Sequence, residues 1–548
     1  MLATAMVGDG PSVSGAVRLW EPMSLPAFTS EGRHLAAARI PALPGSDGRR
    51  EGNLVRLGVG GAVLAFVMLA GLWMSVPVYR PPDEGSHVAY ARELSHGRLP
   101  RINTAIDGSG DLRLSQELST RDATHRTIWT ANHPPLYYAL VALPLRVGSD
   151  TGHPVRGVLV ARLVSVGLSV LGLAALAYVV LQLVPGRPQL AVAATGLTAL
   201  LPSFVSISAR VYNDSLAFLT ATMALAAAVV FVVRGPSAAR LAAVAASASL
   251  AALTRASGLL VAGLAGIAVL VAVWRAGEGT VPRRLGRAVV WVGAVGAAVA
   301  AAAGWFYLRN LTLYGDVTGS AALLDQFGRA PKASMGELLT DLGFWRLQQR
   351  RLWDVTNLLP ATDTGVARQL WLLGVFPVAG LVLAGARRLA RRSGGGPRLD
   401  SGRTLAFVLC VALLGLLQLS QVQFVSAGGG GHVRYLFPGL VTVGLVAAAG
   451  LVALPGGRHG IPVMTMLVAM AAVNLWLWWP HLGIGISQPL SVRAAALPGF
   501  LVGLGLLVVA LWRLRPDAPR PVPSATPTRP PTPSGTPESE PRPYPARL

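Results

Sequence analysis

Apolar residues in this chain are gathered into blocks of about 15 to 25, a length that forms a helix able to cross the roughly 30 Å hydrocarbon core of a bilayer. The composition agrees with this interpretation. Of 548 residues, 52% are hydrophobic and 13% are charged, and the mean hydropathy is +0.52. Soluble domains carry about 25% charged residues. The chain is therefore predicted to be an all-α polytopic membrane protein.

About twelve of these blocks are long enough to span the membrane. The spans are expected near residues 55–79, 157–184, 189–209, 214–234, 238–254, 257–274, 286–308, 369–386, 404–424, 433–454, 461–480 and 495–513. The most basic short loops, Arg275–Arg287 and Arg387–Arg403, are expected in the cytoplasm by the positive-inside rule. If residues 1–53 are also cytoplasmic, both loops fall inside only when the short apolar stretch 134–147 does not span. We therefore predict an interfacial or re-entrant helix at 134–147 and cytoplasmic termini.

This arrangement divides the chain into three parts. Residues 1–53 are polar and show no hydrophobic period, so a disordered cytoplasmic tail is expected. Residues 514–548 are rich in proline and predict a second disordered cytoplasmic tail. The transmembrane domain, 54–513, lies between them and carries two long extracytoplasmic loops, 80–156 and 309–368.

The net charge of +22 comes almost wholly from arginine, because Lys332 is the single lysine of the chain. Many of the arginines stand beside apolar blocks, where they orient helices and meet anionic lipid headgroups. Membrane lipids, and no nucleic acid, are therefore the expected partners of this charge. The single cysteine, Cys410, lies inside an apolar block, which excludes a disulfide framework and a thiolate metal cluster.

Two acids follow the first predicted span, between Pro81 and His87. The adjacent prolines end the transmembrane helix and can begin a new one, on which Asp83 and His87 share a face with Glu84 beside them. A carboxylate at the membrane boundary can act as a general base. It can also hold a divalent cation (Mg or Mn), with Asp83, Glu84, His87 and Asp214 as the candidate ligands. Alternatively, these acids only cap the helix and interact with its dipole.

Two further motifs hold candidate substrate-binding residues. The first loop ends in His133-Pro134-Pro135-Leu136-Tyr137-Tyr138, where His133 and Tyr137 either contact substrate or belong to an aromatic belt at the membrane interface. Asn213 and Asp214 lie between two apolar blocks. They either form an ordinary turn and helix cap or supply a second acid at membrane level, where an uncompensated charge is often functional.

Arginines occur at several predicted outer ends of spans, and the candidate phosphate-binding positions are Arg255, Arg309 with its neighbour Asn310, and Arg434 with its neighbour Tyr435. A guanidinium can bind a phosphate through two parallel hydrogen bonds. Each arginine could equally extend along the membrane surface without a ligand. The run Gly428–Gly431 could form a phosphate-binding nest or a flexible turn.

Taken in order, these motifs resemble bacterial membrane glycosyltransferases of the GT-C fold. The motifs are Asp-Glu after the first span, His-Pro-Pro-Leu-Tyr-Tyr, Asn-Asp, Arg-Asn-x-x-x-Tyr-Gly-Asp from Arg309, and Arg-Tyr-Leu-Phe-Pro from Arg434. The likeness covers about residues 55 to 480 and is closest to protein O-mannosyltransferases, aminoarabinose transferases acting on lipid A, and related uncharacterised actinobacterial membrane proteins. It implies a GT-C-like domain that transfers a sugar from a polyprenyl-phosphate carrier, usually with inversion, to an extracytoplasmic acceptor, which could be a protein, a glycan or a lipid.

The resemblance also implies roles for individual residues. Asp83 matches the position of the catalytic base, with Glu84 as its neighbour, and Asp214 matches the acid of the second outer loop. Arg309 and Arg434 are the expected phosphate-binding residues. Some relatives use a divalent metal and others do not, so the metal requirement stays open and no cofactor is certain. The active site is expected on the extracytoplasmic side of the membrane.

Three other functions are compatible with a polytopic membrane protein of this kind. A transporter or flippase should place polar residues near the bilayer midplane, commonly with an internal repeat, whereas these spans are nearly all Ala, Leu, Val and Gly. A polysaccharide polymerase or ligase shares the lipid-linked donor and the large outer loops, and only the early acid pair weighs against it. A non-catalytic scaffold would leave the ordered acids unexplained. The aromatic residues of the loop 309–368 either cover the site or lie on the membrane surface.

Overall fold

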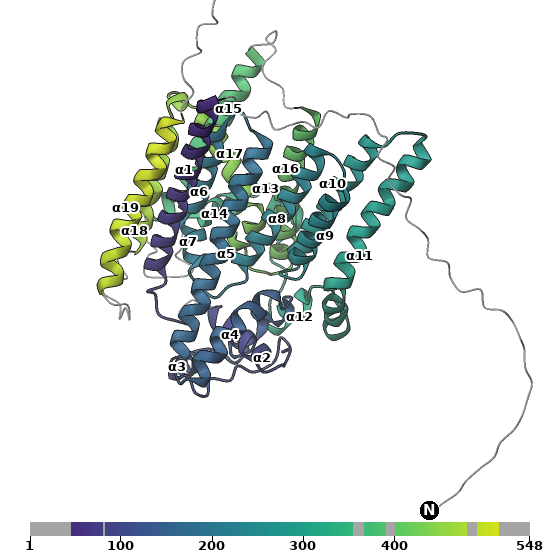
Figure 1. Ribbon diagram of the computed structural model, residues 1–548. Helices are drawn as coiled ribbons and strands as arrows, with labels where there is room; N and C mark the ends of the chain where they lie inside the picture. The colour runs from purple at the N-terminus through teal and green to yellow at the C-terminus, as the bar shows by residue number, and fades with distance from the viewer. Residues whose placement is uncertain (1–44, 80–82, 354–366, 391–399, 479–489, 515–548) are drawn as a thin grey trace, which may run out of the picture. The chain divides into compact units, whose positions relative to one another are not determined.

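The computed structural model describes residues 45–79, 83–353, 367–390, 400–478 and 490–514, all within one compact unit, Pro44–Leu548. Most of each predicted tail lies outside these residues. The described part is built from helices packed side by side (Figure 1). Neighbours in the bundle include α1 with α19, α5 with α8, and α10 with α11. The protein is an all-α, multi-pass membrane protein.

Ten helical stretches of the described part are long and apolar enough to cross a membrane. They are α1 (Gly45–Trp73), α5 (Pro154–Leu183), α8 (Asp214–Arg234), α10 (Ser257–Ala276), α11 (Val281–Tyr314), α16 (Ser401–Ser426), α18 (Ile461–Trp478), α19 (Leu490–Arg513), η4 (Ala367–Gly374) continued by α15 (Val375–Ala390), and η5 (Val433–Gly439) continued by α17 (Leu440–Ala453). The short η6 (Gly457–His459) connects α17 to α18. The first helix ends about six residues before its predicted end, because Pro77 disfavours helix in the residues just before it.

The two remaining predicted spans are also helical but shorter. The block 189–209 forms α6 (Pro188–Ala199) and α7 (Pro202–Ser208), bent by 63°, which make an eleventh span only if they are counted together. Pro202 breaks the helix, and Asn474 Nδ2 donates a hydrogen bond of 2.8 Å to the carbonyl oxygen of Leu200 at the break. The block 238–254 forms the 15-residue α9 (Ala238–Ala252). All twelve blocks are helices, but a count of twelve spans is not confirmed.

The first predicted loop folds into a compact set of short helices. These are α2 (Glu84–Ser95), α3 (Leu112–Ser119), η1 (Ala123–Arg126), η2 (Trp129–Asn132) and α4 (Leu136–Asp150). The helix predicted at 134–147 corresponds to α4, which has 15 residues and is not among the membrane-length helices. It packs against α2 and α5. The short helices lie at one end of the bundle together with α12 (Figure 1).

The second predicted loop begins later than expected, because α11 continues as a helix to Tyr314. It contains α12 (Ser320–Gln326), α13 (Met335–Thr340) and α14 (Leu342–Trp353). Residues 354–366 of this loop lie outside the described part. Ile102 N donates to the Tyr314 hydroxyl at 3.2 Å, and Asn132 Nδ2 donates to the Thr318 carbonyl at 3.1 Å, so this loop and the first one are in direct contact.

Arginines gather where several membrane helices end, at the opposite end of α8 from Asp214. Helix α8 begins at Asp214 and ends at Arg234. At the Arg234 end, Arg234 Nη2 donates to Gln182 Oε1 at 3.0 Å and Arg403 Nε donates to the Gln182 carbonyl at 3.2 Å. Arg275 Nη1 donates to the Ser401 carbonyl at 3.2 Å at the same end. The last residues of α5, α8 and α10 and the first residues of α16 therefore lie close to one another, and several of the side chains there are arginines. The positive-inside rule then predicts that the Asp214 end is extracytoplasmic.

Reporter fusions test this orientation. A fusion at residue 110 is expected outside the cytoplasm, because the loop 80–156 is also rich in arginine but long, and long loops escape the positive-inside rule. Fusions at residues 278 and 395 are expected inside, because they lie in short arginine-rich loops. Paired alkaline phosphatase and fluorescent-protein reporters would measure the side of each position. Finding residues 110 and 395 on the same side would contradict the predicted topology.

Candidate functional site

An ion pair joins two residues that lie far apart in the sequence. Asp83 Oδ2 is 2.5 Å from Arg434 Nη2. Asp83 is the residue before α2, but its side chain makes no capping hydrogen bond to that helix. Arg434 lies in η5, at the start of the stretch that continues as α17. The side chain of Asp83 is 18% exposed and that of Arg434 is 10% exposed, so the pair lies at the edge of the buried interior.

A second ion pair lies next to the first one. Asp214, the first residue of α8, is 1% exposed and pairs with Arg255 of the α9–α10 connection. The Tyr435 ring joins the two pairs, because its centroid is 4.8 Å from Arg255 Cζ and 5.7 Å from Arg434 Cζ. We call Asp83, Asp214, Arg255, Arg434 and Tyr435 the acid–arginine cluster. The structure thus brings five of the predicted site residues together, from four segments of the chain.

Glu84 does not join this cluster. Its Oε1 accepts hydrogen bonds from Arg162 Nε (2.7 Å) and Val211 N (3.1 Å), and its Oε2 accepts from Arg162 Nη2 (2.6 Å) and Tyr79 N (3.0 Å). Glu84 and Arg162 are both 0% exposed. A carboxylate that already accepts four hydrogen bonds, out of reach of solvent, is poorly suited to accept a substrate proton. Through these bonds Glu84 joins α2, α5 and the segment before α8, and its predicted catalytic role stays a prediction.

The histidines pack beneath the cluster. His87 Nδ1 is 3.0 Å from the Tyr138 hydroxyl, and its ring meets Tyr212 edge-on at 5.0 Å. Arg434 Cζ lies 5.3 Å from the centroid of the same Tyr212 ring. Burial is the main cause that holds the pKa of His87 and the pKa of His133 well below the usual value, and the Arg434 and Arg255 guanidiniums lower both further. Both imidazoles are therefore neutral near pH 7.

Four other predicted residues, Tyr137, Asn310, Arg309 and Asn213, are not part of the acid–arginine cluster. The Tyr137 hydroxyl bonds Ser165 Oγ at 2.7 Å in a buried position, and Asn310 Nδ2 donates to the Asn132 carbonyl at 3.1 Å. Arg309 donates to the Pro100 carbonyl at 2.6 Å, and none of its described contacts reaches the cluster. Asn213 precedes Asp214 and is buried, and its Nδ2 has no hydrogen-bond partner among the described residues.

The four candidate metal ligands do not form a ligand set. Within the described residues, no group of three His, Cys, Asp or Glu side chains is placed to hold a metal ion. Asp83 and Asp214 each pair with an arginine, and Glu84 pairs with a third. We therefore derive no step through a metal.

Two residues of this region, Arg162 and Tyr212, are not among those that the sequence motifs predict. Arg162 lies inside an apolar block, and a charged residue inside a predicted span is itself a signal of a buried partner. Tyr212 immediately precedes Asn213 and could have been included with that motif. Its contacts with His87 and Arg434 depend on the packing of α2 and η5, which no local pattern reveals.

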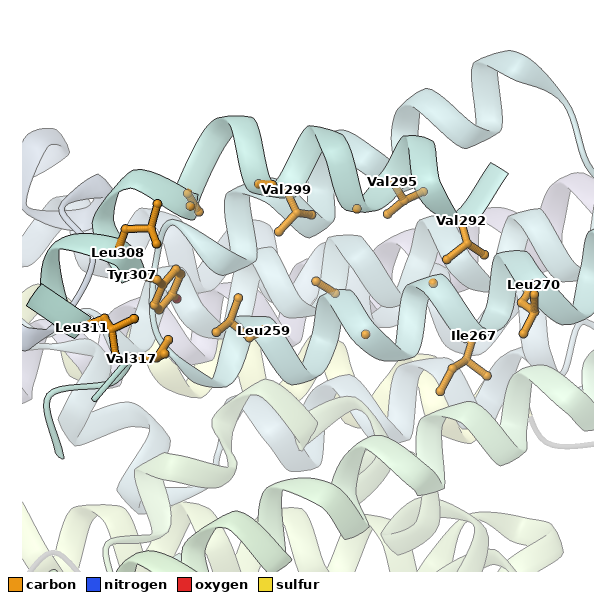
Figure 2. Close-up of a pocket in the computed structure, with 17 residues that line it drawn as sticks. Leu259, Ile267, Leu270, Val292, Val295, Val299, Tyr307, Leu308, Leu311 and Val317 are labelled. Atoms are coloured by element: carbon orange, nitrogen blue, oxygen red, sulfur yellow. The ribbon is translucent and has the colours of Figure 1, made fainter. Parts of the chain in front are cut away.

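An apolar groove of about 690 Å³ lies between α10 and α11 (Figure 2). Figure 2 shows Leu259, Ile267 and Leu270 on α10 and Val292, Val295 and Val299 on α11 along the groove, with Tyr307 at one end. Glycines at 263, 266, 296 and 304 leave the groove open. The Tyr307 hydroxyl donates to the carbonyl oxygens of Ala252 (2.7 Å) and Arg255 (3.2 Å). One end of the groove therefore adjoins the segment that carries Arg255.

Comparison with solved structures finds similarity to ArnT and to an archaeal oligosaccharyltransferase. ArnT from Cupriavidus metallidurans bound to undecaprenyl phosphate is 16% identical with a TM-score of 0.41, and the match covers 82% of this chain and 76% of that one. The same protein in the apo state is 17% identical with a TM-score of 0.40, and the match covers 82% of this chain and 75% of that one. The oligosaccharyltransferase of Archaeoglobus fulgidus in complex with Zn and sulfate is 13% identical with a TM-score of 0.39. The match covers 81% of this chain and 53% of that one, so the chain spans about half of that protein.

No curated protein matches the sequence. A family model described as a predicted membrane protein, DUF2142, matches residues 109–443. This match covers more than half of the chain, from the first loop to the start of α17. The chain therefore belongs to the DUF2142 family of predicted membrane proteins.

Proposed function

We propose that the protein is a GT-C-type membrane glycosyltransferase, which moves a sugar from a polyprenyl-phosphate carrier to an extracytoplasmic acceptor. The observation that carries this proposal is the acid–arginine cluster. Two carboxylates and two guanidiniums from four segments meet at the end of the bundle opposite the arginine-rich end. In such a reaction a carboxylate removes the proton of the acceptor hydroxyl, and neighbouring guanidiniums stabilise the phosphate that leaves.

The proposed reaction is a displacement at the anomeric carbon. The acceptor hydroxyl attacks this carbon while Asp83 takes the hydroxyl proton, and the bond from carbon to the carrier phosphate breaks with its electron pair passing to the phosphate oxygen. Arg434 and Arg255 stabilise that oxygen. Asp83 is assigned as the base because it is 18% exposed, whereas Asp214 is 1% exposed and holds Arg255 in place.

Arg434 has a further hydrogen-bond donor for this purpose. Its Nε is buried and has no hydrogen-bond partner among the described residues. A phosphate at this edge of the guanidinium would compete with Asp83 for the positive charge, which frees Asp83 to accept a proton. The groove between α10 and α11 is the proposed position of the polyprenyl chain, because the groove is apolar and ends at the backbone of Arg255 (Figure 2).

Transfer from polyprenyl-phosphate sugars to an acceptor tests the proposal, with the purified protein in lipid nanodiscs and a panel of labelled hexose and pentose donors. The parent is expected to transfer at least one sugar. Arg434→Gln is expected to slow transfer about 100-fold, since it removes a group that stabilises the leaving phosphate. Arg434→Lys is expected to restore part of the rate.

Arg113→Gln is the matched control, because Arg113 is an exposed arginine of α3 in the first loop. The Arg113→Gln variant is expected to transfer sugar at the parent's rate. The proposal fails if the parent transfers none of the sugars, or if Arg434→Gln and Arg113→Gln transfer equally fast.

A further inference from the structure

The glycine run Gly428–Gly431 forms a surface on which a neighbouring segment packs. Gly428 has φ +104, and a Cβ there would lie 2.5 Å from the carbonyl oxygen of Ala330. A Cβ on Gly431 would lie 2.7 Å from Gln348 Nε2. Lys332 N donates to the Ser426 carbonyl at 3.3 Å. The glycines therefore allow the α12–α13 connection to lie directly against the turn that precedes Arg434.

This contact brings an additional arginine next to His432, close in sequence to Arg434 of the acid–arginine cluster. A Cβ on Gly430 would lie 3.0 Å from His432 Nε2 and 3.7 Å from Arg329 Nη1, so the two side chains flank the same glycine. His432 is two residues from Arg434 in the sequence. Burial, and then the Arg434 guanidinium, lower the pKa of His432 to about 4, and the Arg329 guanidinium adds a smaller lowering.

Arg329 differs from the arginines of the cluster in its exposure and its partners. Its side chain is exposed, whereas Arg434 is buried and paired with Asp83. Within the described residues Arg329 forms no salt bridge, and its guanidinium lies 5.5 Å from the Phe327 ring centroid. The exposed Lys332 follows three residues later. A cation in this state can form an ion pair with an arriving anion without first breaking another pair.

We propose that Arg329 is a phosphate-binding residue at the rim of the site, where it receives the anionic headgroup of the lipid carrier before that headgroup reaches Arg434. The inference rests on the proposed function, since it takes a lipid phosphate as the ligand. The ligand class is a phosphate ester, and the same chemistry would bind free phosphate. The length of the α12–α13 connection and the glycine surface beneath it fix Arg329 in this place.

Binding of polyprenyl phosphate to the full-length protein in nanodiscs is the direct test, with polyprenol lacking the phosphate and inorganic phosphate as separate probes. Arg329→Gln is expected to weaken the binding of polyprenyl phosphate about three- to fivefold, the range of an exposed ion pair. The weakening should diminish at high salt. Polyprenol binding is expected to stay unchanged. Binding of inorganic phosphate at similar affinity would show that the site takes free phosphate and would overturn the lipid assignment.

The kinetic readout separates a binding role from a structural one. Arg329→Gln is expected to raise the KM for the donor by the same three- to fivefold, with kcat changed less than about twofold. Arg329→Lys should keep the parent's KM, and Arg113→Gln is again the control. An unchanged KM in Arg329→Gln, or a loss of kcat as large as the rise in KM, would overturn the inference.

The single lysine of the chain gives an independent measurement. An amine-reactive reagent should modify Lys332, three residues from Arg329, and polyprenyl phosphate should slow this modification more than polyprenol does. Equal rates with the two lipids would count against the inference. Both binding measurements are independent of catalysis, so a parent that binds polyprenyl phosphate through Arg329 but transfers no sugar would refute the proposed function and leave this inference standing.

Discussion

Asp83→Asn is expected to lower the rate of sugar transfer by about a thousandfold, the effect of removing a general base. The amide of asparagine cannot accept the acceptor's proton, but it has nearly the same size and can still accept a hydrogen bond from Arg434. The KM for the donor should therefore change little. Initial rates with saturating labelled donor measure the loss, and thermal unfolding in the same nanodiscs shows whether the variant is folded.

The control for this variant is Asp122→Asn. Asp122 is an exposed acid of the same loop, and its side chain makes no capping bond to η1. The Asp122→Asn variant is expected to transfer sugar at the parent's rate. Asp83→Glu should keep part of the activity, since it retains a carboxylate. If Asp83→Asn transfers sugar as fast as Asp122→Asn, Asp83 is not the base, and the mechanism is wrong even if the protein is a glycosyltransferase.

Arg162→Gln is expected to destabilise the folded protein by about 3–5 kcal/mol, the cost of leaving one member of a buried ion pair without its partner. Besides Glu84, Arg162 Nη1 donates to the carbonyls of Met74 (3.0 Å) and Val76 (2.8 Å). The substitution thus loosens the end of α1, the start of α2 and the contact with α5 together. The yield of folded protein and the midpoint of thermal unfolding measure this loss.

Arg156→Gln on the exposed part of α5 is the matched control and is expected to leave stability unchanged. Glu84→Gln should lower the free energy of unfolding by a similar amount. The double variant should lose less stability than the sum of the two single losses, because the two residues form one pair. Burial alone would raise the pKa of Glu84, but Arg162, together with Arg210 and the Val211 N–H, outweighs burial and holds that pKa below its usual value. The stabilisation is therefore present above about pH 4.5 and is lost as the pH falls below it. A Glu84→Gln variant that folds like the parent but transfers no sugar would support the predicted catalytic role of Glu84.

The membrane helices could be predicted from the sequence because their cause is local. A run of about 20 apolar residues in lipid must bond its backbone internally, and a helix does this within the run itself. Helix α8 has the bounds Asp214–Arg234, the same as the predicted span 214–234. The prediction that 134–147 is too short to cross agrees with α4, whereas the broken pair α6 and α7 depends on Pro202 and on a distant asparagine.

The roles of adjacent acids could not be decided in this way. Consecutive residues on a helix point about 100° apart, so only one of Asp83 and Glu84 can face a given neighbour. Which one does so depends on how α2 is rotated against α4 and α5, and that rotation is set by packing between distant segments. In the structure Glu84 faces Arg162 and Asp83 faces Arg434.

Among the predicted phosphate-binding arginines, the structure likewise separates Arg255 and Arg434 from Arg309. All three stand at the ends of apolar blocks, and their local sequences look alike. The sequence by itself determined that the chain crosses the membrane many times and that acids and arginines gather near the ends of its spans, because hydrophobic length and charge position are properties of each segment. Only the tertiary structure decided which acid meets which arginine, because an ion pair requires two side chains within about 4 Å, and that distance depends on how segments hundreds of residues apart pack together.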